Sequence, residues 1–134
     1  MKHISFLFLP TIFIATFFFR SFKLSTVPFG LYIDETSIGY NAFSIVSTGK
    51  DEYGKKFPLF FAAFGEYKLP VYIYSVALVQ LIAGPTDLSV RLPALIYGLL
   101  SVIFVYYLTR EVLEDAKEHK MARIAPYLSA LTMG

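Results

Sequence analysis

Three long apolar runs constrain this chain more than any other feature of its sequence. They extend from Ile4 to Phe22, from Leu69 to Ala83 and from Leu92 to Leu108. A helix rises about 1.5 Å per residue and must cover roughly 30 Å of hydrocarbon to cross a bilayer. The first and third runs approach that length, whereas the second is short and suits a tilted, locally thinned or re-entrant segment. The sequence therefore predicts an all-α membrane protein with transmembrane helices over these ranges.

Composition supports this interpretation. The 134 residues are 56% hydrophobic and only 16% charged, against about 25% charged in a typical globular protein. A net charge of +2 is too small to indicate a nucleic-acid partner. Because the chain has no cysteine, a disulfide framework, a thiolate metal site and a cysteine nucleophile are excluded. A further apolar run begins near Ile124, and we expect the start of a fourth span there.

A cleaved signal peptide is the alternative interpretation of the first run, since Lys2 precedes an apolar core. The bulky residues Phe17, Phe18 and Phe19 stand where a cleavage site would need small ones. We therefore favour a retained span. Between the second and third runs, the sequence Gly84-Pro85-Thr86-Asp87 predicts a turn that joins them as a hairpin.

The connection from residue 23 to residue 68 is long, and loops of that length carry function or structure of their own. The pattern over residues 34–48 predicts a helix that Asp34 caps at the N-terminus and Gly49 terminates. Its amphipathic pattern indicates a juxtamembrane helix lying along the membrane surface. Residues 50–56 form a polar turn, and Phe57–Phe64 should lie at the membrane interface. The expected apolar face consists of Ile38, Ala42, Phe43, Ile45 and Val46.

The distribution of cations bears on orientation. Three crossings would place the long connection and the charged stretch Arg110–Arg123 on the same side of the membrane. Both are rich in Lys and Arg, so the positive-inside rule alone favours a cytoplasmic location for both and an outside N-terminus.

Two neighbouring acids, Asp34 and Glu35, begin the predicted surface helix. Neighbours on a helix point about 100° apart, so they cannot act together on one substrate atom. One of them could serve as a general base. The alternative is structural: Asp34 caps the helix and Glu35 is favoured by the helix dipole.

Two cations flank the later spans. Lys68 precedes the second apolar run and could bind a lipid phosphate, or it could snorkel beside an interfacial Tyr67. Arg91 precedes the third run and could contact a phosphate head group or anchor the end of that span.

In their order and spacing these pieces resemble the N-terminal part of a known family. The pieces are Phe29-Gly30-Leu31-Tyr32-Ile33-Asp34-Glu35, then Tyr53-Gly54 and Phe57-Pro58, then Tyr67-Lys68-Leu69-Pro70-Val71-Tyr72 and Ser89-Val90-Arg91-Leu92-Pro93. The pattern, from residue 4 to about residue 115, resembles the membrane-integral, lipid-sugar-dependent glycosyltransferases of the GT-C type. These include the protein O-mannosyltransferases and the lipid A aminoarabinose transferases.

The resemblance implies a function and a set of site residues. Such enzymes move a sugar from a polyprenyl-phosphate donor to an acceptor at the extracytoplasmic face. Asp34, with Glu35 beside it, matches their catalytic acidic position, and Lys68 and Arg91 match cations near the donor phosphate. The acceptor could be a protein, lipid or glycan, and a divalent metal is a possible requirement. The family also implies an inside N-terminus and an extracytoplasmic long loop, against the charge count.

Relatives run to several hundred residues with ten or more spans. We therefore expect this chain to be an N-terminal fragment, inactive alone, in a bacterial or archaeal plasma membrane. The alternative is a small non-catalytic assembly or scaffold protein that uses the long loop for docking.

Overall fold

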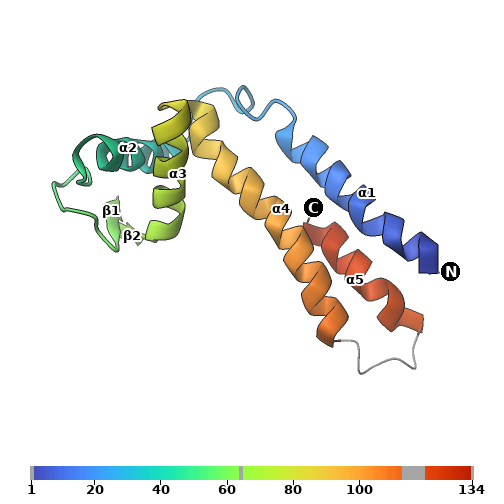
Figure 1. Ribbon diagram of the computed structural model, residues 1–134. Coiled ribbons are helices and arrows are strands. Elements are labelled where there is room, and N and C mark those ends of the chain that lie inside the picture. The colour runs from blue at the N-terminus through green and yellow to red at the C-terminus, as the bar shows by residue number, and fades with distance from the viewer. Residues whose placement is uncertain (1, 64, 113–119, 134) are drawn as a thin grey trace. The chain divides into compact units, whose positions relative to one another are not determined.

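The computed structural model describes residues 2–63, 65–112 and 120–133, and they are mostly helical (Figure 1). The helices are α1 (Lys2–Ser21), α2 (Ile33–Thr48), α3 (Pro70–Ala83), α4 (Asp87–Val112) and α5 (Lys120–Met133). Each helix expected from the sequence is present. The strands β1 (Phe61–Ala63) and β2 (Glu66–Lys68) correct the all-α expectation, because they form an antiparallel pair within the long connection.

Among the described residues, α4 is the one helix both long and apolar enough to cross a membrane. The apolar helices Leu9–Ser21 and Pro70–Ala83 are shorter, so a multi-pass topology stays a prediction. Of the charged stretch after α4, residues 113–119 lie outside the described residues, as does residue 64 of the expected interfacial segment.

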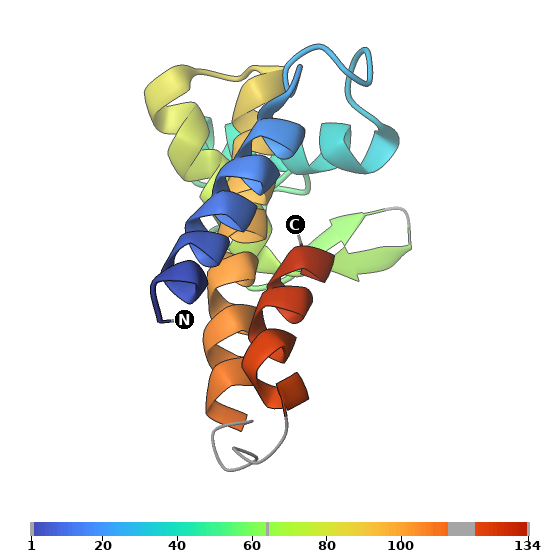
Figure 2. The same ribbon diagram turned by 90° about the vertical axis from the view of Figure 1, so that its right-hand side faces the viewer.

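The chain divides into two compact units, and residues 1–22 and 95–134 form the first. Its small core contains Ile12, Val102 and Ala130. The second half of α4 runs beside α5 (Figure 2), where the rings of Tyr106 and Tyr127 lie 5.2 Å apart between centroids.

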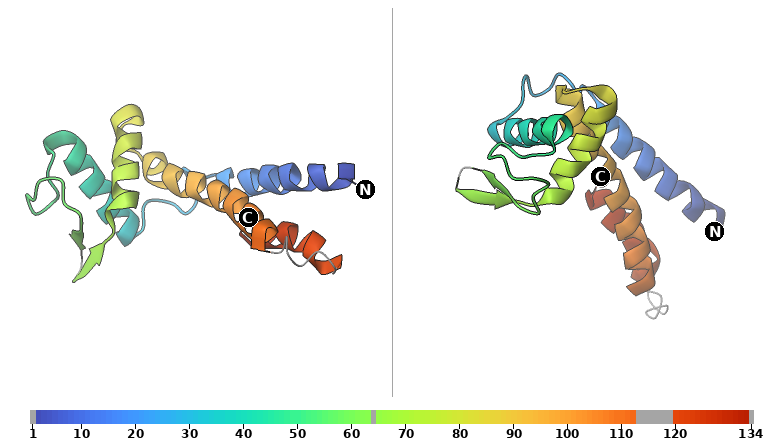
Figure 3. Two further views of the ribbon diagram at one scale, coloured as in Figure 1. Left: turned by 60° about the horizontal axis from the view of Figure 1, so that its bottom comes forward. Right: turned by 60° about the vertical axis from the view of Figure 1, so that its left-hand side comes forward.

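Residues 23–94 form the second unit, which carries every predicted site residue. Helix α2 packs against α3, and the β1–β2 hairpin leads into α3 (Figure 3). The Tyr74 hydroxyl of α3 donates to the Pro58 carbonyl at 3.0 Å, which ties the preceding loop to this helix. The core of this unit consists of Ala42, Ile45, Phe61, Ile73, Val76, Ala77 and Val90.

The buried face of α2 differs from the expected one. Phe43 and Val46 are exposed, whereas Asn41 is buried beside Ala42. Burial of Asn41 is satisfied by hydrogen bonds, because its side-chain amide donates to the Ser37 carbonyl and to the Glu52 carboxylate, both at 3.0 Å. The helix therefore packs through a narrower apolar stripe than the pattern predicted, and it leaves large apolar side chains on its outer surface.

Candidate functional site

The first turn of α2 presents two acids in different roles. Tyr32, and not Asp34, is the N-cap residue, because Ile33 is already helical. Glu35 closes the helix start, since its carboxylate accepts the Tyr32 backbone N–H at 3.1 Å. The predicted capping role of Asp34 is therefore wrong, and its carboxylate is available for another partner.

Asp34 instead pairs with Lys68. The Lys68 ammonium lies 2.9 Å from the Asp34 carboxylate and also donates to the Asp34 backbone carbonyl at 3.4 Å. The two residues are brought together by the hairpin, because Lys68 is the last residue of β2 and is paired with Phe61 in the buried β1. The side chain of Lys68 is 18% exposed and that of Asp34 is 65% exposed. A sheltered cation thus holds an acid that solvent and ligands can reach.

Glu35 pairs with the other predicted cation, Arg91. The guanidinium donates to both carboxylate oxygens, from Nε at 3.2 Å and from Nη2 at 3.1 Å. This pairing lowers the pKa of Glu35, against the opposing effect of burial. The two neighbouring acids are therefore held by different cations and do not form a pair with each other.

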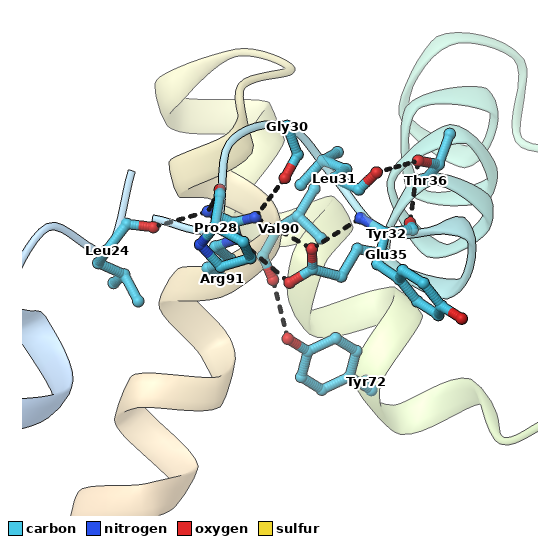
Figure 4. A network of polar contacts seen from close by, with 10 residues as sticks. All are labelled: Leu24, Pro28, Gly30, Leu31, Tyr32, Glu35, Thr36, Tyr72, Val90 and Arg91. Atoms are coloured by element: carbon cyan, nitrogen blue, oxygen red, sulfur yellow. Dashed lines mark hydrogen bonds and ion pairs between the residues drawn. The ribbon is translucent and has the colours of Figure 1, made fainter. Parts of the chain in front are cut away.

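Arg91 is buried and makes five hydrogen bonds (Figure 4). Besides the two to Glu35, it donates to the carbonyls of Leu24 and Pro28 at 3.1 Å and of Gly30 at 2.6 Å. An arginine has five N–H donors, so none remains for a phosphate. Arg91 lies near the N-terminal end of α4, so the interpretation that it anchors the end of that span stays a prediction. The geometry makes it a clamp on the segment before α2.

An open hollow of about 390 Å³ lies on another face of α2, lined by Ser37, Tyr40, Glu52 and Tyr53 among others. The sequence pattern did not identify Asn41 as a residue of this region. Its side-chain amide donates a hydrogen bond to the carboxylate of Glu52, which lies at the edge of the hollow. A lone Asn within an apolar helical pattern is the signal that could have identified it. Within the described part of the chain, the buried Ser37 hydroxyl has no hydrogen-bond partner.

The described residues bring together no group of three or more His, Asp or Glu side chains that could hold a metal ion. Comparisons of the chain with models of protein families, with curated proteins and with solved structures find no match. The assignment of function therefore rests on the residues and geometry above.

Proposed function

We propose that this chain supplies the general base and the phosphate-binding cation of a membrane glycosyltransferase. Its donor is a polyprenyl-phosphate sugar, and its acceptor is a hydroxyl group at the extracytoplasmic face. The observation that carries the proposal is the pairing of Asp34 with Lys68 at 2.9 Å. An accessible carboxylate beside a sheltered ammonium is the combination that this reaction needs, and the sequence resemblance points to the same two residues.

The chemistry follows from the two charges. An acceptor oxygen forms a bond to the anomeric carbon of the sugar while Asp34 takes up the hydroxyl proton. The bond between that carbon and the phosphate oxygen breaks, and the electron pair leaves with the lipid phosphate. Lys68 stabilises the charge that develops on this leaving group. A single carboxylate acting as base suits inversion at the anomeric carbon, by analogy with glycosidases.

Donor binding and access to the base are coupled in this proposal. A phosphate bearing negative charge competes with Asp34 for Lys68, because both are anionic partners of one ammonium. As the ammonium turns toward the phosphate, the Asp34 carboxylate leaves the ion pair and its oxygens are open to the acceptor hydroxyl.

Arg91 and Glu35 have supporting roles. Because all five donors of Arg91 are in use, we assign it as a positioning residue and not as a phosphate ligand. Glu35 closes the start of α2 and anchors Arg91. Together they fix the helix turn from which Asp34 projects.

Sugar transfer by the protein in its native membranes tests the proposal. Asp34→Asn should lower the rate of transfer by about a hundredfold or more, the range of general-base catalysis. The matched control is Glu66→Gln, because Glu66 is an exposed acid of the hairpin strand that also carries Lys68. Because the Asp34 side chain is 65% exposed and an asparagine keeps an oxygen that can accept from Lys68, Asp34→Asn should cost about 1 kcal/mol of stability and still fold.

Lys68→Ala should weaken donor binding, whereas Lys23→Ala, at an exposed lysine of the same unit, should not. Full transfer activity in Asp34→Asn would reject the enzyme proposal. It would favour the non-catalytic assembly or scaffold protein.

A further inference from the structure

The segment between α2 and β1 exposes lysines and large apolar side chains together. We call residues 50–60 the Lys–Phe loop. Phe57, Leu59 and Phe60 are 64%, 71% and 54% exposed. The cations Lys50, Lys55 and Lys56 are exposed in the same segment. The loop runs from the end of α2 to β1 (Figure 3), and its Pro58 carbonyl accepts the hydrogen bond from Tyr74 of α3.

Hydrogen bonds to backbone groups hold the loop in one conformation. The buried Asp51 carboxylate accepts the backbone N–H groups of Tyr53 and Lys55, at 3.0 and 2.8 Å. Phe57 has a φ of 38°, in the left-handed region that a bulky residue rarely adopts. Its N–H donates to the Gly49 carbonyl at 3.1 Å. Backbone strain of this kind persists only where the surroundings impose it, so the exposed Phe57 ring is presented by a fixed turn.

Both acids of the loop are engaged by the protein. Asp51 is buried, and the Glu52 carboxylate accepts a hydrogen bond from the buried Asn41. Glu52 is exposed, so three exposed lysines stand against one exposed acid and the surface of the loop carries a net positive charge. Exposed apolar side chains interleaved with cations are typical of a surface that inserts into the headgroup region of anionic lipids.

We propose that the Lys–Phe loop docks on a bilayer containing anionic lipid. Phe57, Leu59 and Phe60 enter the boundary between headgroups and acyl chains, and the lysine ammonium groups contact lipid phosphates. A neutral bilayer offers the apolar interaction alone. Docking therefore depends on lipid charge and weakens as salt concentration rises.

Fluorescence quenching in lipid nanodiscs tests this proposal. The chain has no cysteine, so Leu59→Cys carries a single bimane label. The discs contain phosphatidylcholine, with or without phosphatidylglycerol, and nitroxide-bearing lipids that quench a label close to the membrane. A second label, at Phe104→Cys on an exposed position of α4, checks that the protein is inserted in the disc. Only preparations in which this label is quenched are compared.

We expect the Leu59 label to be quenched strongly in discs with phosphatidylglycerol and weakly in discs without it. Lys56→Gln should lower the ratio of docked to free loop roughly fivefold, the factor that corresponds to about 1 kcal/mol per cation near an anionic surface. Lys56→Arg, which keeps the charge, should retain the quenching. Equal quenching in both kinds of disc would overturn the proposal. Absence of quenching in the anionic discs would also overturn it and would indicate water or a protein partner at the loop.

Discussion

Replacing Arg91 with alanine removes the clamp that joins the start of α4 to the start of α2. The side chain of Arg91 is 6% exposed and that of Glu35 is 33% exposed. The substitution leaves three carbonyl groups and a half-buried carboxylate without their charged donor. Removing one partner of a buried ion pair costs about 3–5 kcal/mol. Because water can reach Glu35 in part, we expect the lower end, about 3 kcal/mol.

This free energy should appear as local opening of the segment that Arg91 holds. The Leu24 carbonyl is one of its acceptors, and the peptide bond after Lys23 is a trypsin site in that segment. A loss of about 3 kcal/mol raises the open fraction roughly a hundredfold. When opening is fast relative to cleavage, the rate of proteolysis follows that fraction. We therefore expect cleavage after Lys23 to accelerate by a similar factor in Arg91→Ala.

The matched control is Arg110→Ala, which removes an exposed arginine from the last turn of the same helix. It should leave cleavage after Lys23 unchanged. Arg91→Lys should fall between the two, because an ammonium has three donors and cannot reproduce a planar fork. If Arg91→Ala and Arg110→Ala are cleaved at the same rate, the clamp described above does not hold the segment.

Two further predictions concern pH and close packing. The pKa of Glu35 is lowered from 4.5 by Arg91, so its stabilising effect is present at neutral pH and is lost as the pH falls through the lowered value. The difference in melting temperature between the wild type and Glu35→Gln should accordingly shrink between neutral pH and about pH 3. A Cβ at Gly39 would lie 2.9 Å from a methyl group of Val90, so Gly39→Ala should lower stability by about 1–3 kcal/mol in thermal unfolding. Gly98→Ala should cost less, because the nearest atoms there belong to the end of a flexible arginine; equal losses would contradict the packing argument.

The helices could be predicted because their signals are local. Apolar runs mark α1, α3 and α4, and Gly49, with a φ of 70°, ends α2 in the left-handed conformation that favours glycine. Helix α4 begins at Asp87, before the predicted range, because that range follows the apolar run, which starts only at Leu92. Thr86 gives the better signal, since its hydroxyl accepts the Ser89 N–H at 3.2 Å at the start of the helix. The short hairpin escaped prediction because strands of three residues carry almost no alternation.

The candidate residues could be chosen from the sequence, but their partners could not. Asp34 and Lys68 meet only through the hairpin, which fixes Lys68 opposite Phe61. Arg91 looked like a phosphate ligand because a sequence does not reveal that three backbone carbonyls would occupy its donors. Ion pairs between residues far apart in the chain depend on tertiary structure. The spacing of residues in the sequence does not determine them.

Cysteine labelling at residue 34 tests the central claim most directly. The chain has no native cysteine, and the Asp34 side chain is 65% exposed, so Asp34→Cys gives one accessible thiol. Ser47→Cys, at an exposed position of the same helix, is the matched control. A membrane-impermeant maleimide should label both thiols in intact spheroplasts as fully as after permeabilisation. Labelling of residue 34 only after permeabilisation would place the acid in the cytoplasm and contradict sugar transfer at the outer face.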